Sequence, residues 1–244
     1  MFHRVTQIAL AAGLTLAIAG PVAAIPAAAQ GLSGHAQVAQ AEQKPKRHPG
    51  KRLYMRNTCI ACHGRDGAMA IMDYPNVAGQ DEKYIIAQIE DIMEGKRTGS
   101  PDATGNPRAQ GMRGALVTPE GQPRLDKETI KTIADWLASL EPAKLAAPET
   151  PLDPNNVAAG EKLYAKMKCR TCHGKDGNKP LKGYPYIAGQ KRAYLVAQMT
   201  DIRDKKRTNG KVKAMYPMIK KASDDDIAQL ADYLSQVERA SGKK

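Results

Sequence analysis

Two copies of the pattern Cys-x-x-Cys-His are the residues of this chain whose types and spacing point most directly to chemistry. They read Cys-Ile-Ala-Cys-His at residues 59–63 and Cys-Arg-Thr-Cys-His at 169–173, and they contain all four cysteines of the 244 residues. Two cysteines at this spacing can form thioethers with one haem, and the adjacent histidine can then bind the iron. We therefore expect two covalently bound haem c groups, with His63 and His173 as iron ligands. The predicted attachment residues are Cys59, Cys62, Cys169 and Cys172.

Three other uses of paired cysteines fit this sequence less well. A zinc ion held by the four cysteines would leave the histidine after each pair unexplained. A thioredoxin-like redox pair belongs to a βαβ context, and no Val/Ile-rich strand runs flank either motif. Disulfides within each pattern would close loops too short to staple a chain of this length. Haem attachment is the interpretation that uses every residue of both motifs.

Each iron needs a second axial ligand, and counting side chains narrows the choice to methionine. The three histidines outside the motifs, His3, His35 and His48, all precede the first predicted helix, and no cysteine is spare. Met112 and Met215 begin matching Met-x-Gly/Pro-x-aliphatic segments, and we predict them as the ligands, with Met218 as the alternative to Met215. A thioether ligand raises the haem potential and fills the iron site, which suits an electron carrier.

An internal repeat organises the chain. A shift of 110 residues aligns residues 50–98 with 160–208 without a gap, including identical Gly-x-Asp-Gly, Ala-Gly-Gln and Lys-Arg-Thr segments. The chain therefore reads as a tandem duplication of one haem domain. We predict a first domain at residues 48–140 (copy one) and a second at 157–240 (copy two), joined by a Pro- and Ala-rich linker at 141–156.

Three helices are predicted in each copy, and no strand pattern competes with them, so the expected fold class is all-α. The first helix is expected at Gly50–Cys59 in copy one and at Ala158–Cys169 in copy two. The middle helix is expected at Asp81–Glu94 and at Lys191–Asp204. The last helix is predicted to open at Asp126 in copy one and at Ser223 in copy two, where Asp226 completes a capping pattern.

The N-terminal segment has the features of a secretory signal peptide. Arg4 precedes an apolar run at residues 8–19 and small residues at 27–29, so we predict cleavage near Ala29, with Ala24 and Ala41 as alternatives. A retained membrane anchor is the competing interpretation of this segment. Residues 30–47 are expected to form a flexible lead-in, and the mature protein is expected in the periplasm.

The net charge of +12 is concentrated in the second half of the chain. Residues 30–140 carry 15 Lys and Arg against 13 Asp and Glu, whereas residues 141–244 carry 21 against 12. Redox protein partners are expected, with acceptor docking on the basic second domain. Nucleic acid is a poor candidate because aromatic residues are 5% of the chain and export is predicted. Peripheral contact with anionic lipids of the inner membrane is the alternative use of this charge.

With both haem motifs in place, the chain resembles the dihaem cytochrome c4 family over roughly residues 48–239. The resemblance is carried by the two haem motifs, the Tyr-Pro-x-Val/Ile-Ala-Gly-Gln segments at 74–80 and 184–190, the Lys-Arg-Thr segments, Met112 and Met215. It implies two cytochrome c-like domains related by pseudo-twofold symmetry, with haems close enough for rapid electron exchange. The Pro- and Gly-rich segment at 99–125 departs from the family pattern.

The resemblance also implies how the helices pack and how the histidines are held. In small c-type cytochromes the first and last helices cross closely, which a glycine and an aromatic residue at the crossing would suit. We expect these contacts to pair Gly50 and Tyr54 with Trp136, and Gly160 and Tyr164 with Tyr233. A carbonyl near Pro75 or Pro185 is expected to accept the Nδ1–H of the iron-binding histidine.

The expected function is that of a periplasmic dihaem electron carrier, not an enzyme, passing single electrons towards a terminal oxidase or another respiratory acceptor. The alternative is the dihaem subunit of a flavocytochrome c, in which the same domains would stay on a flavin-containing sulfide dehydrogenase. A weaker alternative is a dihaem redox enzyme, which would need an open or differently ligated iron.

Overall fold

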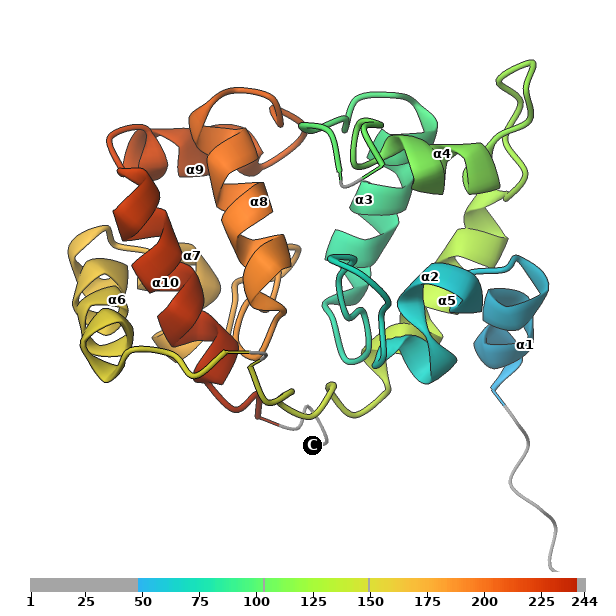
Figure 1. The fold of residues 1–244 in the computed structure, drawn as a ribbon. Coiled ribbons are helices and arrows are strands. Elements are labelled where there is room, and N and C mark those ends of the chain that lie inside the picture. Colours follow the sequence, from blue (N-terminus) through green and yellow to red (C-terminus); the bar gives the residue numbers. More distant parts are fainter. Residues whose placement is uncertain (1–47, 103, 149, 241–244) are drawn as a thin grey trace, which may run out of the picture. The chain divides into compact units, whose positions relative to one another are not determined.

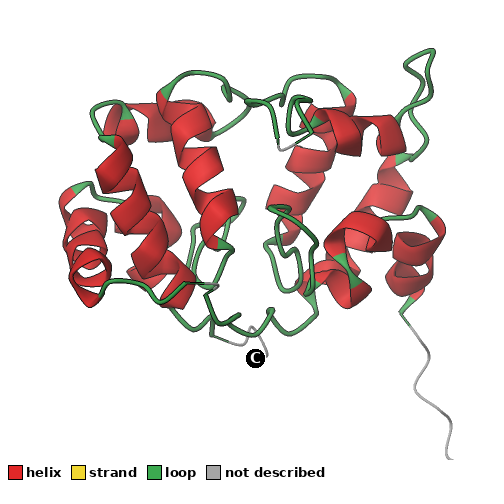
Figure 2. Cartoon of the chain, in the orientation of Figure 1, coloured by secondary structure: helices red, strands yellow, loops and turns green. Residues whose placement is uncertain are grey.

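The computed structural model describes residues 48–102, 104–148 and 150–240, and within these ranges it is helical with no strand (Figures 1 and 2). The predicted signal peptide and the whole predicted lead-in at 30–47 lie outside the described residues. Extended pairing in these ranges is limited to the isolated bridges Pro101–Pro107 and Val117–Pro123. The all-α prediction is confirmed. None of the described helices is long and apolar enough to cross a membrane.

Both copies use the same order of helices (Figure 1). Copy one contains α1 (Pro49–Arg56), α2 (Ile60–His63), α3 (Glu82–Met93), α4 (Gln110–Leu116) and α5 (Lys127–Ala138). Copy two contains α6 (Pro154–Lys166), α7 (Arg170–His173), α8 (Arg192–Arg203), α9 (Val212–Ile219) and α10 (Asp224–Gln236). A 3-10 turn follows each haem motif, at Arg65–Gly67 and at Lys175–Gly177.

The first helix of each copy ends before the motif, whereas the sequence predicted that it runs through the first cysteine. Thr58 and Lys168 both take the left-handed conformation, with φ of 57°. This conformation breaks the helix, because it is unfavourable for residues with a Cβ and cannot continue a right-handed helix. Cys59 and Cys169 then precede the short helices α2 and α7.

The short helices α4 and α9, which carry Met112 and Met215, were not predicted from the sequence. The predicted architecture left these segments as connections between the middle and last helices. Gly111 and Gly114 lie inside α4, and Pro217 lies inside α9. These residues are the poorest helix formers, so local propensity argues against the helices that tertiary packing produces here.

Helices α3, α5 and α10 begin at residues whose side chains cap them. Asp81 accepts a hydrogen bond from the amide of Tyr84 at the start of α3, and Asp126 accepts one from Thr129 at the start of α5. Ser223 and Asp226 form a reciprocal capping box at the start of α10. These side chains satisfy amides that have no partner within the helix.

The predicted glycine–aromatic crossings are confirmed in both copies. A Cβ placed on Gly50 would lie 2.3 Å from Trp136 Cβ, and one on Gly160 would lie 2.0 Å from the carbonyl oxygen of Gln229. The Tyr54 and Trp136 rings lie 5.1 Å apart between centroids, and the equivalent rings of Tyr164 and Tyr233 lie 6.0 Å apart. Only glycine permits the first and last helices to approach this closely.

Candidate haem centres

Each haem motif lies on one turn of helix, which determines the direction in which its cysteines and histidine point. The His63 amide donates to the Cys59 carbonyl at 3.0 Å, and the His173 amide donates to the Cys169 carbonyl at 3.1 Å. Residues three and four positions apart share one helical face, so both cysteines and the histidine of a motif face the same side. The four cysteines, all within the described residues, form no disulfide.

The two motif histidines are oriented by backbone carbonyls, as predicted. Nδ1 of His63 donates to the carbonyl of Pro75 at 3.0 Å, and Nδ1 of His173 donates to that of Pro185 at 3.0 Å. Because a carbonyl can only accept, the proton lies on Nδ1 and leaves the Nε2 lone pair free. Burial lowers the pKa of both histidines, more than the Pro carbonyls raise it, which favours the neutral, metal-binding form.

A pocket in each copy brings the predicted site residues together. The copy-one pocket is lined by Cys59, Cys62, His63 and Met112, with Ile92 and Leu116 among its apolar walls. The copy-two pocket is lined by Cys169, Cys172, His173 and Met215, with Ile202 and Ile219 among its apolar walls. Every residue that the sequence singled out for haem attachment or iron ligation therefore lines one of the two pockets.

The methionines differ in how firmly they are held. Met112 on α4 packs against the core of copy one, and Met215 on α9 packs against the core of copy two. Met218 also lines the copy-two pocket, but 46% of it is exposed. Met215 is the better placed of the two, and its ligation stays a prediction. His48 at the start of the first domain caps α1 by accepting a hydrogen bond from the Gly50 amide.

A central cavity joins the two centres. Its walls include His63 and Met112 of copy one together with His173 and Met215 of copy two. Each pocket is also lined by residues of the other copy, an arrangement that we call the exchange of walls. Helix α8 of copy two contributes Gln198 to the copy-one pocket, and α3 of copy one contributes Gln88 to the copy-two pocket. Neither pocket is built from one copy alone.

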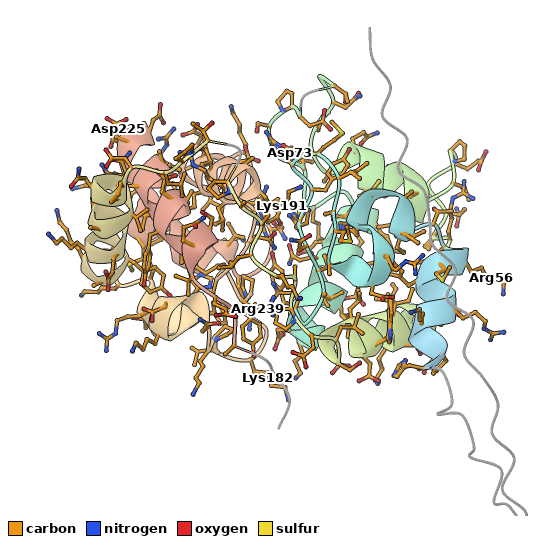
Figure 3. All side chains as sticks on the ribbon, turned by 60° about the horizontal axis from the view of Figure 1, so that its bottom comes forward. Arg56, Asp73, Lys182, Lys191, Asp225 and Arg239 are labelled. Carbon is orange, nitrogen blue, oxygen red and sulfur yellow. The ribbon has the colours of Figure 1, made fainter. Side chains whose placement is uncertain are left out.

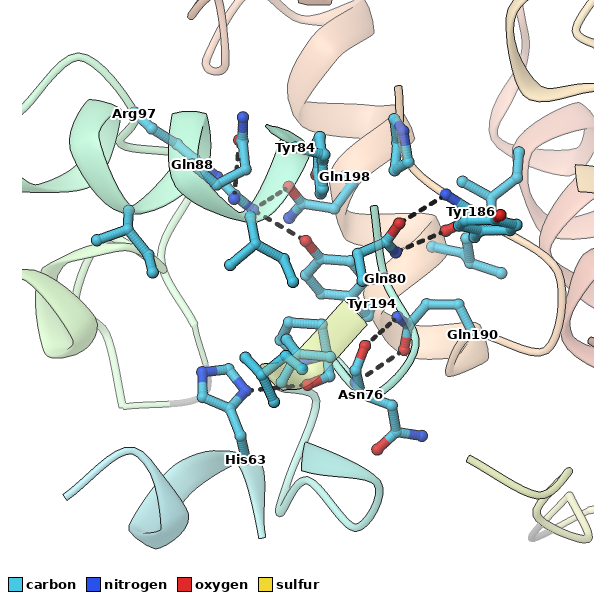
Figure 4. A pocket seen from close by; sticks show the side chains of 18 of the residues that line it. His63, Asn76, Gln80, Tyr84, Gln88, Arg97, Tyr186, Gln190, Tyr194 and Gln198 are labelled. Atoms are coloured by element: carbon cyan, nitrogen blue, oxygen red, sulfur yellow. Dashed lines mark hydrogen bonds between the residues drawn. The ribbon is translucent and has the colours of Figure 1, made fainter. Parts of the chain in front are cut away.

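Arg97 and Arg207, one from each copy, occupy the boundary between the pockets (Figure 4 labels Arg97). Arg97 donates to Gln88 at 3.0 Å, and across the boundary to Gln198 at 3.0 Å. Arg207 mirrors this, donating to Gln198 at 2.7 Å and across the boundary to Gln88 at 2.8 Å. Although burial would raise the pKa of Tyr84, the two guanidinium groups lower it.

These two arginines provide a test of whether haem fits. Arg207 is 6% exposed, and within the described ranges no carboxylate lies at ion-pair distance from either guanidinium. A buried cation without an anionic partner is costly. Haem supplies two carboxylates and a large apolar ring, which suit these guanidinium groups and the apolar pocket walls. The residues present fit the group.

Paired glutamine side chains also tie the copies together (Figure 4). Gln80 donates to the carbonyl of Tyr186 at 2.9 Å and accepts from its amide at 2.8 Å. Gln190 makes the same pair of bonds with Asn76, at 2.8 and 3.0 Å. Sequence reasoning assigned no role to these glutamines or to Arg97 and Arg207, although each belongs to a segment that the repeat duplicates. The signal available in the sequence was the recurrence of the same polar residue at equivalent positions of both copies.

Comparisons with known proteins agree with this geometry. The family model for cytochrome c matches residues 48–141 and 157–238. Cytochrome c4 of Azotobacter vinelandii is 36% identical over 186 residues, covering 72% of this chain and 82% of that protein. The crystal structure of reduced recombinant cytochrome c4 from Pseudomonas stutzeri superposes with a TM-score of 0.62 at 31% identity, covering 78% of this chain and 97% of that one.

A thiosulfate dehydrogenase electron acceptor of Stutzerimonas stutzeri is 28% identical over 185 residues, covering 73% of this chain and 78% of that protein. The matching segments fall on both haem motifs, and the superposed structure has both domains. Two c-type motifs, two pockets and these relatives lead to one conclusion. The chain belongs to the dihaem cytochrome c4 family of electron-transfer proteins, with two covalently bound haem c groups.

Proposed function

We propose that this protein is a periplasmic carrier that moves single electrons through two His/Met-ligated haems. The first haem would be held by Cys59, Cys62, His63 and Met112. The second would be held by Cys169, Cys172, His173 and Met215. The observation that carries the proposal is the placement of a carbonyl-oriented histidine and a methionine on the walls of each pocket.

The haem iron supplies the reversible ferric–ferrous exchange, and the residues of the chain tune and protect it. Pro75 and Pro185 hold the histidine rings in one orientation and one tautomer. The thioether of a methionine would favour ferrous iron. With a histidine and a methionine as its protein ligands, each haem would have no position open to a substrate and would serve electron exchange alone.

Exchange of electrons between the two haems is supported by the central cavity, which His63 and His173 both line. Hydrogen bonds from Gln80, Gln190, Arg97 and Arg207 fix the two copies against each other at this boundary. A fixed separation keeps the electron-transfer rate between haems constant while either one is reduced from outside.

Relatives indicate which reactions would supply the electrons. A 28%-identical relative is an electron acceptor of thiosulfate dehydrogenase. We propose that the present protein takes electrons from a periplasmic oxidoreductase of this kind and passes them towards a terminal oxidase. The predicted removal of residues 1–29 on export belongs to the same proposal.

Near-infrared spectra with redox titration test the two ligand sets. The ferric wild-type protein should show methionine-to-iron charge-transfer absorption for two haems. Met112→His or Met215→His should each remove half of it and lower one midpoint potential by roughly 0.1–0.3 V, a fraction of the ~0.8 V that axial ligands span. Met218→Leu is the control and should change neither quantity. A high-spin haem in the wild-type protein would refute the carrier.

A further inference from the structure

Several lysines lie around the mouth of the copy-two pocket, and two of them approach Gly183. A Cβ placed on Gly183 would lie 2.7 Å from Lys211 Nζ and 3.8 Å from Lys83 Cβ, and Lys182 is the preceding residue. Lys83, Lys168 and Lys211 line the pocket itself. We call the exposed residues Lys83, Lys168, Lys182 and Lys211 the lysine rim.

The four lysines of the rim outnumber the carboxylates at this mouth, where Asp81 accepts a hydrogen bond from the Gly183 amide and Asp91 lines the pocket. Lys211 donates to the carbonyl of Lys182 at 3.1 Å, and its ammonium lies 4.3 Å from the centroid of the Tyr184 ring. Both partners are uncharged. Within the described ranges no carboxylate lies at ion-pair distance from any of the four lysines.

The mouth of the copy-one pocket differs at the equivalent positions. Asp73 replaces Gly183 and pairs with Arg108, so these two charges cancel, and the ammonium of Lys191 is bound by backbone carbonyls of residues 70–72. Met72 replaces Lys182 and is 51% exposed, and Met69 replaces Lys179 and is 73% exposed. The basic surface is therefore a property of the second mouth and not of the repeated fold.

We propose that the lysine rim is the docking face for an acidic redox protein, which exchanges electrons with the second haem. This inference rests on the proposed carrier function and names the partner class for one of its two haems. The rim surrounds the opening that leads to Cys172 and His173, so a partner bound there has its own redox group near the second haem. Complementary charge speeds such encounters and orients them.

Exposed apolar residues at the same mouth favour a protein over a lipid surface. Leu181, beside Lys182, is 55% exposed, and Met218, on the pocket wall, is 46% exposed. Apolar side chains surrounded by charged ones give the centre and periphery expected of a protein–protein interface. Figure 3 shows Lys182 near the boundary between the copies, where Lys83 of copy one joins the rim.

The test measures reduction of the ferric holoprotein by reduced plant-type ferredoxin, an acidic one-electron donor, in a stopped-flow spectrometer. The rim variant is Lys168→Gln/Lys182→Gln. The matched control is Lys162→Gln/Lys166→Gln, which removes two exposed lysines of α6 that do not line the pocket. Both variants lose the same net charge from the same copy.

At low ionic strength the second-order rate constant should fall about threefold to tenfold in the rim variant and less than about twofold in the control. The difference should vanish near ~1 M salt, where the screening length is ~3 Å. Equal losses in both variants would show that only net charge matters and would overturn the proposal. An unchanged rate in the rim variant would overturn it too.

Two further measurements distinguish failure of the docking proposal from failure of the carrier function and from lipid binding by the rim. Reduction by a neutral hydroquinone should be the same in all variants, and failure of the wild-type haems to cycle with it would refute the carrier function itself. Co-sedimentation with phosphatidylglycerol vesicles addresses the membrane. If the rim variant loses vesicle binding but keeps its ferredoxin rate, the rim binds lipid and the docking proposal is wrong.

Discussion

The two copies repeat the same skeleton, but the loops that follow their haem motifs differ in charge. Both copies have the carbonyl-held histidine, the glycine–aromatic crossing and a methionine on a short helix. At the pocket mouths, however, Asp73 and Met72 of copy one are replaced by Gly183 and Lys182 of copy two. The residues predicted to hold a cofactor are the same in both copies, whereas exposed residues at the pocket mouths differ. One fold therefore presents two different surfaces.

A second contrast lies at the start of the middle helices, where residues of opposite charge both bind backbone groups of the other copy. Asp81 caps α3 and also accepts a hydrogen bond from the amide of Gly183 at 3.1 Å. Lys191 precedes α8 without capping it, and its ammonium instead donates to the carbonyls of Ala70, Ile71 and Met72. Each side chain ties its helix to the motif loop of the other copy.

The largest effect is expected from removing one pair of attachment cysteines. Cys59→Ala/Cys62→Ala should reduce the intact mass by one haem and leave the second haem attached, and Cys169→Ala/Cys172→Ala should do the converse. Each haem is bound by thioethers within its own copy, so attachment should be independent. Mass spectrometry and haem absorbance measure the result. Loss of both haems from either variant would show that the copies acquire them together.

The next effect concerns the helix crossings. Gly160→Ala and Gly50→Ala should each lower the free energy of unfolding by more than about 2 kcal/mol, because the new Cβ overlaps atoms that are fixed in α10 or α5. Gly160→Ala should cost more, since it meets a backbone carbonyl at 2.0 Å, whereas the equivalent carbonyl near Gly50 lies at 2.4 Å. Denaturant unfolding of the holoprotein measures both. The exposed Ala158→Ser is a control with an expected cost below ~0.5 kcal/mol.

Removing one boundary arginine should lower the haem potentials. A cation near the haem disfavours ferric iron, which carries one more positive charge, so Arg207→Gln should stabilise the ferric state by on the order of 1 kcal/mol, or ~40 mV for one electron. Arg97→Gln should act in the same direction but less strongly, since Arg97 is less deeply buried. Spectroelectrochemical titration measures the shifts, and a rise in potential would contradict the argument.

The smallest effect is a difference in acid sensitivity between the last helices. Hydrogen bonds from Thr129 lower the pKa of Asp126 from its ordinary 3.8, whereas α10 is capped by the hydroxyl of Ser223. The Asp126 cap therefore contributes above the unfolded-state pKa and is lost as pH falls through the lower folded-state pKa. The stability advantage of the wild-type protein over Asp126→Ser should be constant above about pH 5 and should shrink as the pH falls from there through the folded-state pKa. A difference independent of pH would show that the Asp126 charge plays no part.

The sequence is most informative where chemistry is local. Features that depend on a few neighbouring residues were predictable. They are the haem motifs, the caps at Asp126 and Ser223, and the apolar spacing of the middle helices. Met112 was predicted as a ligand by aligning the two halves, and it lines the copy-one pocket, but Gly111 and Gly114 argued against the helix that carries it. Helix propensity describes single residues, and here tertiary packing overrides it, which is why the sequence did not predict this helix.

Contacts between the copies were harder to predict because they join residues about 100 positions apart. Gln80 and Arg97 are polar residues whose spacing indicates no buried face, and their partners come from the other half of the chain. The repeat marked both residues as duplicated but gave no reason for it. Only the arrangement of the two copies shows that these side chains are buried against each other.

The exchange of walls between the pockets has a consequence for how such a protein could arise and mature. Because Gln88 lines the second pocket and Gln198 the first, a single copy expressed alone would lack the part of its pocket wall that the other copy supplies. Two identical single copies could cover each other across a twofold axis, since Gln80 and Gln190 make the same bonds in opposite directions. Fusion converts such a homodimer into one polypeptide. Because a chain is synthesised from its N-terminus, the first pocket is then completed only after the second domain has followed.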